Sequence, residues 1–415
     1  MSRLIILLAF IIVGTSLIQN SAFSNDDRVL TGLNRLVMSD FELLQGKRVG
    51  LITNATGVDY RLNSIVDLFY ESENVNLVAM FAPEHGVRGD YTAGEYVESY
   101  IDERTGLPVY SLYGKTRKPT PEMLEGLDVL VYDIQDIGAR SYTYISTMGV
   151  AMEAAAENGI GFIVLDRPNP LGGEKIEGNV AEEGYFSFVS QFPIPYVYGL
   201  TSGELARMIN EEGWLKNGVK VDLYVMPMAG WRRDMTFEET GLEWVPTSPH
   251  IPHRDSAIYY TATGILGELY FINIGVGYTT PFQTFAAEWI DSYELSSRLN
   301  ALDLDGVIFR PVTYRPYYGT DEGKIVHGVQ VHLTDYREVN LISLQYHFLE
   351  IHHALYPDKN PFDHAKNRHA MFDRVSGTSK VRELFTERMK YEDIEEFLNK
   401  DVESFRELSA KYYLY

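Results

Sequence analysis

Short apolar segments alternate with polar loops and amphipathic segments between Arg48 and Pro227, and this pattern limits the possible folds most strongly. Strands that alternate with helices and are apolar throughout are typical of an α/β domain with a largely parallel sheet. Thr201 and Glu204 form a capping box that predicts the start of one helix. The predicted strands are residues 48–53, 76–81, 109–112, 128–134, 161–166 and 221–226, and the predicted helices include residues 64–71, 121–125, 144–158 and 202–214.

Polar and ionisable residues gather where four of these strands end. The ends read TNATG (residues 53–57), PEHG (83–86), YDIQD (132–136, with Arg140 close behind) and DRPNPLGG (166–173). Asp, Asn and Gly also form ordinary turns, which would explain any single loop. Because ligands of parallel sheets bind beyond the carboxyl ends of the strands, four such loops together predict a functional site.

The alternation weakens after Pro252, which predicts a second, smaller α/β domain. We expect one domain over residues 25–252 and another over residues 253–415, joined by the proline-rich segment PTSPHIPHRD (246–255). Residues 279–288 and 328–335 resemble loop and strand pieces, and residues 338–353, 381–398 and 402–415 resemble helices.

The N-terminus has the pattern of a signal peptide. Arg3 precedes an apolar stretch over residues 4–17, and Ala22-Phe23-Ser24 places small residues before a cut after Ser24. The stretch is shorter than the ~20 residues that span a bilayer, so we expect no membrane anchor after cleavage. The absence of cysteine rules out disulfides and a thiol nucleophile, and a net charge of −22 argues against nucleic acid as a partner. We therefore expect a periplasmic or secreted protein.

Several common enzyme motifs are missing. The sequence has no GxGxxG or GxxxxGK[ST] loop for nucleotide phosphates, no HExxH and no GxSxG. Carboxylates, one early histidine and several arginines remain.

Glu84 is the leading candidate for a general acid. Pro83 and Gly86 would fix the turn around it, and the apolar Phe81 and Ala82 could raise its pKa, which a general acid at neutral pH requires. Pairs of carboxylates from separate strands cleave glycosidic bonds. The possible partners are Asp133, Asp136, Asp166 and Glu268. A structural role for Glu84, as a turn cap or in an ion pair with Arg88, is equally open on these grounds.

Other polar groups of the strand ends have two readings. His85 is more typical of an orienting hydrogen-bond donor than of a base. Arg88, Arg140 and Arg167 either pair with neighbouring Asp residues or form a fork for a substrate carboxylate.

Five stretches carry a resemblance to a known family. They are GLITNATGVD (50–59), FAPEHGVRGD (81–90), DIQDIGARSYTY (133–144), LDRPNPLGG with EGN (165–173 and 177–179) and YGLTSGELA (198–206), and they resemble the exo-β-N-acetylmuramidase (NamZ-type) glycoside hydrolases, formerly a domain of unknown function. The resemblance implies a Rossmann-like domain followed by a smaller α/β domain, with the active-site cleft between them. It also implies release of N-acetylmuramic acid from the non-reducing end of peptidoglycan fragments, without a cofactor or metal.

The resemblance places the catalytic glutamate at Glu84. Together with the strand-end argument, it gives a candidate site in which the substrate is a peptidoglycan-derived saccharide or muropeptide. The candidate catalytic residues are Glu84, Asp133 and Glu268, and the candidate substrate contacts are Asn54, His85, Arg88, Asp136, Arg140, Asp166, Arg167 and Asn169.

The second domain departs from the family pattern. Many members have an Arg and a Thr where this chain has Val276 and Tyr278. Either the pair alters recognition of the leaving group, or Val276 simply packs in the domain core. Two other functions stay open: a non-catalytic muropeptide-binding protein, and a metal-assisted amidase or deacetylase that uses His85, Asp90 and Asp133.

Overall fold

The computed structural model describes residues 28–89 and 98–415. The predicted signal peptide at residues 1–24 lies outside the described residues, as does Asp90. Within the described part of the chain, no helix has both the length and the apolar character that crossing a bilayer requires.

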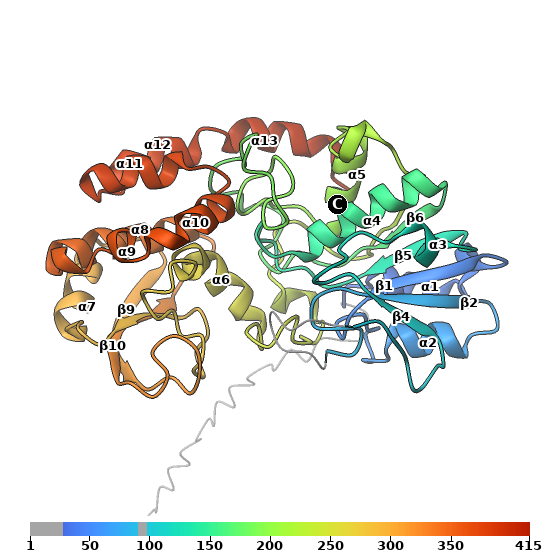
Figure 1. Ribbon diagram of the computed structural model, residues 1–415, viewed down its shortest axis with the longest axis horizontal. Coiled ribbons are helices and arrows are strands. Elements are labelled where there is room, and N and C mark those ends of the chain that lie inside the picture. Colours follow the sequence, from blue (N-terminus) through green and yellow to red (C-terminus); the bar gives the residue numbers. More distant parts are fainter. Residues whose placement is uncertain (1–27, 90–97) are drawn as a thin grey trace, which may run out of the picture.

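A seven-stranded sheet forms the centre of the first domain (Figure 1). All neighbouring strands pair in parallel except β3 and β4. The chain builds outward from β1 in both directions, so the strand order reverses between β1 and β5, where such sheets bind ligands beyond the strand ends. In spatial order the strands are β3 (Tyr100–Ile101), β4 (Pro108–Ser111), β2 (Asn76–Ala82), β1 (Arg48–Thr53), β5 (Val129–Asp133), β6 (Gly161–Leu165) and β7 (Leu223–Met226).

Helices cover both faces of this sheet. Successive residues of a strand point to opposite faces, so Leu130 and Tyr132 join one hydrophobic cluster and Val129 and Val131 join another. Helices α4 (Tyr144–Asn158) and α5 (Ser202–Glu211) pack in the first cluster, with α3 (Pro121–Leu124) beside α4. Helices α1 (Gly32–Met38) and α2 (Ile65–Glu71) pack in the second. The predicted capping box of Thr201 and Glu204 starts α5.

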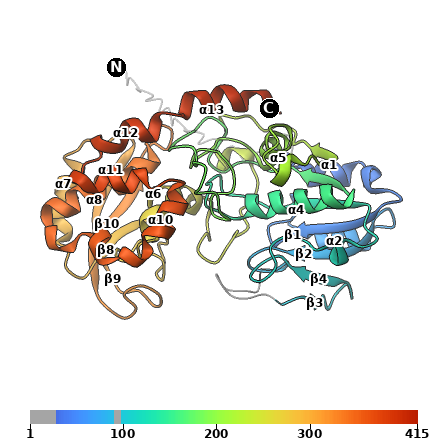
Figure 2. The ribbon, with the colours of Figure 1, turned by 45° about the horizontal axis from the view of Figure 1, so that its top comes forward.

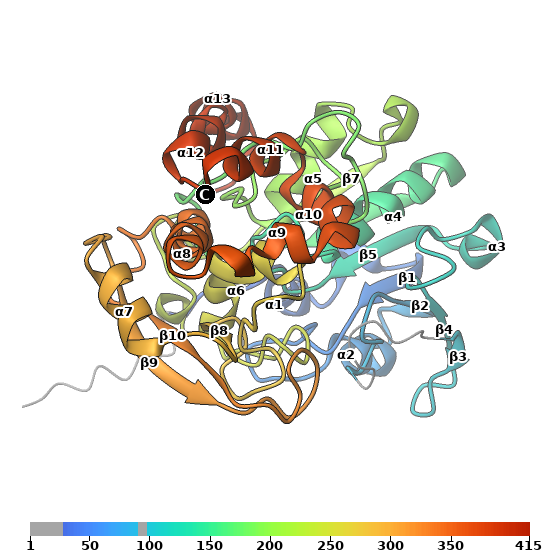
Figure 3. The same ribbon diagram turned by 60° about the vertical axis from the view of Figure 1, so that its left-hand side comes forward.

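The second domain is built on a small antiparallel sheet (Figure 3). Its core joins Phe285, Val329 and Phe348 from both strands and helices. The strand order is β8 (Thr284–Ala287), β10 (Val326–Leu333) and β9 (Val307–Tyr314), and the helices are α6 (Arg254–Gly267), α7 (Ser292–Asn300), α8 (Leu341–Leu355), α9 (Pro361–His364), α10 (His369–Ser376), α11 (Lys380–Arg388) and α12 (Glu392–Asn399).

The end of the chain returns to the first domain. Helix α13 (Val402–Ser409) leads from the second domain to α5 (Figure 2). Phe405 and Tyr412 join the hydrophobic cluster of α4 and α5, and the Tyr415 hydroxyl donates to Asp166 at 2.8 Å. The end of the chain therefore packs against the first domain, although it follows the second in sequence. The domain boundary between residues 252 and 253 stays a prediction.

The predicted fold class is confirmed, whereas some elements differ in detail. Helix α4 has the predicted bounds. The segment 381–398 forms two helices, because Met389 adopts a left-handed backbone with φ 54°. Strand β9 was not predicted, since Arg310 and Pro311 interrupt its apolar pattern.

Candidate functional site

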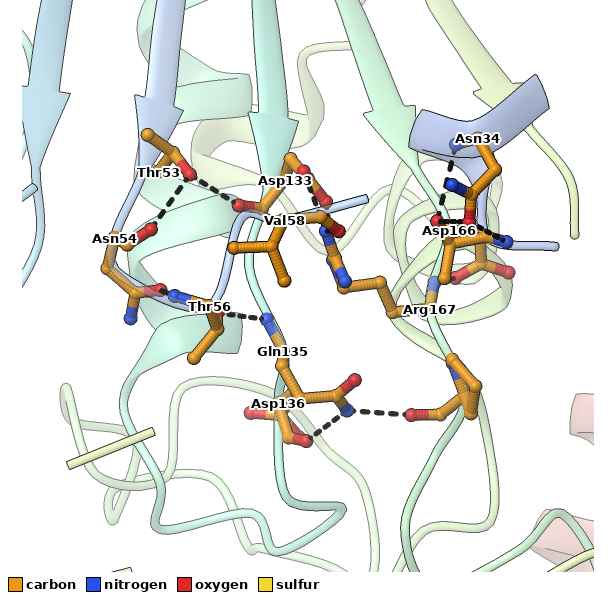
Figure 4. Close-up of polar contacts among 12 residues, drawn as sticks. Asn34, Thr53, Asn54, Thr56, Val58, Asp133, Gln135, Asp136, Asp166 and Arg167 are labelled. Carbon is orange, nitrogen blue, oxygen red and sulfur yellow. Dashed lines mark hydrogen bonds and ion pairs between the residues drawn. The ribbon is translucent and has the colours of Figure 1, made fainter. Parts of the chain in front are cut away.

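The ends of β1, β5 and β6 carry a connected polar network (Figure 4). Asp133 ends β5, and its two oxygens accept hydrogen bonds from Arg167 Nε (2.5 Å) and from a terminal nitrogen of Arg167 (2.8 Å). Arg167 also donates to the Val58 carbonyl at 2.9 Å. Both oxygens of Asp133 are thus occupied by Arg167, and the side chain is fully buried, so it presents no surface to a substrate. We therefore assign Asp133 a positioning role and drop it from the candidate catalytic residues.

Hydrogen bonds also join the loops after β1 and β5. The Asn54 side-chain oxygen accepts from the Thr56 backbone (2.9 Å) and hydroxyl (2.6 Å), and the Gln135 N–H donates to that hydroxyl at 2.9 Å. A cavity of about 20 Å³ beside these residues and Arg167 has room for about one water molecule, so it is too small for a sugar. The network fixes the loops, and a sugar must bind at another part of the strand ends.

Glu84 lies in a strained turn directly after β2. His85 is buried and has φ 76°, a conformation that costs a non-glycine residue ~1–3 kcal/mol and occurs often at functional sites. Tyr113, beyond the end of β4, forms a hydrogen bond with Glu84. Burial and the Glu84 carboxylate raise the pKa of Tyr113 to about 12, so its hydroxyl stays protonated and donates.

Tyr144 connects Glu84 with Asn54. Tyr144 is the first residue of α4. Its hydroxyl lies within electrostatic range of Glu84 and forms a hydrogen bond with the Asn54 side chain. The Tyr144 hydroxyl donates to the Thr247 carbonyl at 2.5 Å. The structure thus brings Glu84, His85 and Asn54, all predicted site residues, to one place.

The proline-rich segment and the second domain also contribute residues to the surroundings of Glu84. Burial and His85 lower the pKa of His250, while Glu84 opposes them, so His250 lies within range of both strand-end residues. His250 Nε2 lies 2.9 Å from the Tyr318 hydroxyl, and the two rings stack at 5.9 Å. Tyr318 belongs to the loop between β9 and β10 and is 48% exposed.

Asp136 keeps one oxygen without a hydrogen-bond partner among the described residues, its Oδ1. Its Oδ2 accepts from the Gly138 N–H at 2.7 Å and from the Tyr198 hydroxyl. Burial raises the pKa of Asp136 to about 6, although these hydrogen bonds oppose the shift. Asp136 therefore holds a proton at mildly acidic pH and remains a candidate.

Asp166 is occupied by structural contacts. Its oxygens accept from the Thr201 hydroxyl (2.7 Å), the Gly203 N–H (2.8 Å) and the Tyr415 hydroxyl (2.8 Å). Burial raises the pKa of Asp166 to about 7. Since Asp166 has no exposed surface and joins β6, α5 and the chain end, we drop it from the candidate substrate contacts.

Asn169 is likewise structural. Its amide donates to the Leu200 carbonyl and its oxygen accepts from the Leu171 N–H, both at 2.9 Å. A Cβ at Gly138 would lie 2.3 Å from that oxygen, which explains the glycine. The buried Asn169 shapes its loop, so we drop it from the substrate contacts as well.

The three arginines predicted to bind a carboxylate have partners within the protein. Arg88 contacts both oxygens of Asp102, at 2.8 and 3.1 Å. Arg140 is buried, and its three nitrogens donate to the Ser190 hydroxyl and to backbone carbonyls that include Val375 on α10. Because every nitrogen of Arg140 is used, we drop it from the site, whereas the partly exposed Arg88 remains a candidate.

Glu268 directly follows α6 in the second domain. Its carboxylate lies 3.0 Å from Arg368, and burial raises its pKa despite this partner. Tyr260 lies near Glu268, and its ring packs against Tyr142, which in turn packs against Tyr144. A row of tyrosines thus leads from the surroundings of Glu84 to those of Glu268.

The family departure falls on a packed loop. Val276 packs against the second-domain core, and Tyr278 stacks on Tyr314 at 4.7 Å and lies 5.3 Å from Tyr317. Val276 therefore has the packing role that the sequence left open, while Tyr278 supports Tyr314 at the end of β9 and Tyr317 in the β9–β10 loop.

Sequence reasoning missed Tyr113, His250 and Tyr318. The position of Tyr113 just after a predicted strand was a usable signal. The sequence pattern around His250 indicates only a linker, and Tyr318 follows a strand, β9, whose apolar pattern is interrupted. Of the residues proposed for a metal-assisted enzyme, Asp90 lies outside the described residues and Asp133 is paired with Arg167. The part of the chain that the structure describes contains no group of three His, Asp or Glu side chains suited to hold a metal ion.

Comparisons with known proteins cover both domains. The N-terminal and C-terminal models of the family "Exo-beta-N-acetylmuramidase NamZ" match residues 49–255 and 258–415. Peptidoglycan β-N-acetylmuramidase NamZ of Bacillus subtilis (strain 168) is 45% identical over 388 residues, which cover 94% of this chain and 92% of that protein.

Two crystal structures of DUF1343 family proteins from Bacteroides fragilis NCTC 9343 are also similar. One has a TM-score of 0.90 at 58% identity and covers 94% of this chain and 99% of its own. The other has a TM-score of 0.76 at 28% identity and covers 93% of this chain and 99% of its own. With both family models matching along nearly all of the described sequence, the chain belongs to the exo-β-N-acetylmuramidase NamZ family.

Proposed function

We propose that this protein is an exo-acting glycosidase that releases N-acetylmuramic acid from the non-reducing end of peptidoglycan fragments. Family membership supports this activity, because the matches extend over both domains and the Bacillus subtilis relative is a peptidoglycan β-N-acetylmuramidase. The substrates are peptidoglycan-derived saccharides.

The observation that carries the proposal is the setting of Glu84. A strained turn directs it from the end of β2, Tyr113 forms a hydrogen bond with it, and Tyr144 and His250 lie within its electrostatic range. Glu84 acts as the general acid that protonates the glycosidic oxygen as the bond to the leaving sugar breaks. Tyr113 orients the carboxyl group for this transfer.

The second catalytic group is one of the predicted carboxylates other than Glu84. Asp133 and Asp166 have both oxygens occupied by protein groups. Asp136 differs from them because its Oδ1, although buried, has no partner among the described residues, and Glu268 is partly exposed beside Arg368. We therefore retain Glu268 and Asp136, together with Asn54, His85 and Arg88 as substrate contacts and Arg167 as the residue that holds their loops.

We also propose that the protein is exported to the periplasm or the exterior. The positive N-terminus, the apolar stretch over residues 4–17 and the small residues Ala22 and Ser24 before the cut support cleavage by a signal peptidase after Ser24. Peptidoglycan lies outside the cytoplasmic membrane, which agrees with this location.

The role of Glu84 is tested by Glu84→Gln. The substitution keeps the shape of the side chain but removes its acid function, so hydrolysis of a natural muramyl saccharide should fall ~10²–10⁴-fold. An activated aryl muramide needs less protonation of its leaving group and should lose less. Turnover near that of the wild type on both substrates would exclude Glu84 as the acid.

A further inference from the structure

Arg117 is a positively charged residue close to Tyr113, the hydrogen-bond partner of Glu84. It lies in the loop between β4 and α3, shortly after Tyr113 in the sequence. The loops that carry Tyr113 and Glu84 leave neighbouring strands at the same edge of the sheet, because β4 pairs in parallel with β2 and the Leu112 N–H donates to the Ala82 carbonyl at 2.8 Å.

The charge of Arg117 also lowers the pKa of Tyr113, against the larger effect of burial. The guanidinium carbon lies 4.4 Å from the centre of the Phe188 ring. The face of the planar guanidinium packs on the ring, and the N–H groups at its edge stay available to a ligand.

Arg117 forms no ion pair with a carboxylate of the described residues. Its neighbour Lys118 differs, since it contacts Glu157 at 2.7 Å and Glu153 at 3.5 Å. Arg88 and Arg167 are each paired with an aspartate, and Arg140 is buried. Of these four arginines, Arg117 is the one that is exposed and has no ion pair among the described residues.

The proposed substrate supplies a matching anion. N-acetylmuramic acid differs from N-acetylglucosamine by a lactyl ether that ends in a carboxylate. A protein with a net charge of −22 repels this group unless a cation stands at its binding position. An arginine with a free fork can form two parallel hydrogen bonds with a carboxylate.

We propose that Arg117 binds the lactyl carboxylate of N-acetylmuramic acid and gives the enzyme its preference for muramides over glucosaminides. The inference rests on the proposed function and assigns a specificity residue to the same site. Tyr113 is linked to both residues: it forms a hydrogen bond with Glu84, and the charge of Arg117 acts on its hydroxyl.

The test pairs a change in the protein with a change in the substrate. The substrates are an aryl β-N-acetylmuramide, the same compound with its lactyl carboxylate converted to a methyl ester, and the aryl β-N-acetylglucosaminide. The variants are Arg117→Gln, which removes the charge, Arg117→Lys, which keeps a charge without the fork, and Lys118→Gln, which makes the same charge change one residue away. Thermal melts establish that each variant is folded.

Wild-type protein should prefer the free acid over its ester by about tenfold or more, which is the usual worth of a charge-assisted pair. Arg117→Gln should abolish this preference by raising KM for the acid, with kcat and the turnover of the ester nearly unchanged. Arg117→Lys should restore part of the preference, and Lys118→Gln should keep it in full.

Two outcomes overturn the assignment separately from the function. A wild-type enzyme that hydrolyses the acid and the ester equally well, or an Arg117→Gln variant that keeps the preference, would show that Arg117 does not bind the carboxylate. Wild-type protein that hydrolyses no muramide would refute the proposed function, and the assignment with it.

Discussion

Asp133→Asn separates a positioning role from a catalytic one. The substitution removes the charge that faces Arg167 at 2.5 and 2.8 Å, in a place where Asp133 is fully buried and Arg167 is 6% exposed. The guanidinium then stays buried with a neutral amide and the Val58 carbonyl as its partners. Breaking a buried pair in this way costs ~3–5 kcal/mol of folding free energy.

Chemical denaturation of the wild type and Asp133→Asn measures this loss, and steady-state assays at a temperature where both are folded measure kcat. We expect the full loss of stability, but a decrease in kcat well short of the ~10²–10⁴-fold effect of removing a catalytic acid or base. The matched control is Asp128→Asn at the other end of β5, where the exposed pair with Arg48 should contribute far less. Unchanged stability with a large loss of kcat would return Asp133 to the catalytic residues.

Three further predictions concern pH, the chain end and the second-domain wall. Burial raises the pKa of Asp136 to about 6 and that of Asp166 to about 7, so their stabilising contributions are complete below the unfolded pKa near 3.8 and are lost as pH rises through the folded values. Unfolding free energy should therefore fall between about pH 4 and pH 7, and Asp136→Asn should flatten this dependence by about 3 kcal/mol, whereas a parallel curve would contradict the shift. Tyr415→Phe removes the hydrogen bonds to Asp166 and from the Met228 N–H and should cost about 2–3 kcal/mol in a denaturant titration. Tyr413→Phe, whose hydroxyl lies 3.3 Å from Ser409, should cost less, and equal losses would argue against the role of the Asp166 contact. Tyr318→Ala should raise KM several-fold for a disaccharide, because Tyr318 holds His250 beside Glu84, and the exposed Tyr293→Ala on α7 should not; identical KM values for both would remove Tyr318 from the site.

Much of the first domain could be predicted because its signal is local. The apolar pattern and the capping box gave α4 and the start of α5, and the positions of strand ends brought Glu84, His85 and Asn54 together. The roles of individual charged groups could not be predicted in this way. Whether Arg140 faces substrate or the Val375 carbonyl depends on a contact across 235 positions of the chain, and no local pattern encodes it.

The second domain was harder for a related reason. Its elements depend on pairing between distant segments, as in β8 with β10, and on packing around a loop that includes Tyr278. Tyr318 and His250 meet only because the two domains meet, so neither segment showed a role by itself.

Product analysis on defined disaccharides tests whether the protein is an exo-acting N-acetylmuramidase. One substrate carries N-acetylmuramic acid at its non-reducing end and N-acetylglucosamine at its reducing end, and the other has the two sugars in the reverse order. We expect the wild type to release free N-acetylmuramic acid from the first disaccharide and to leave the second intact, and Glu84→Gln to cleave the first ~10²–10⁴-fold more slowly. Cleavage of neither disaccharide, or of the second in preference to the first, would contradict this activity.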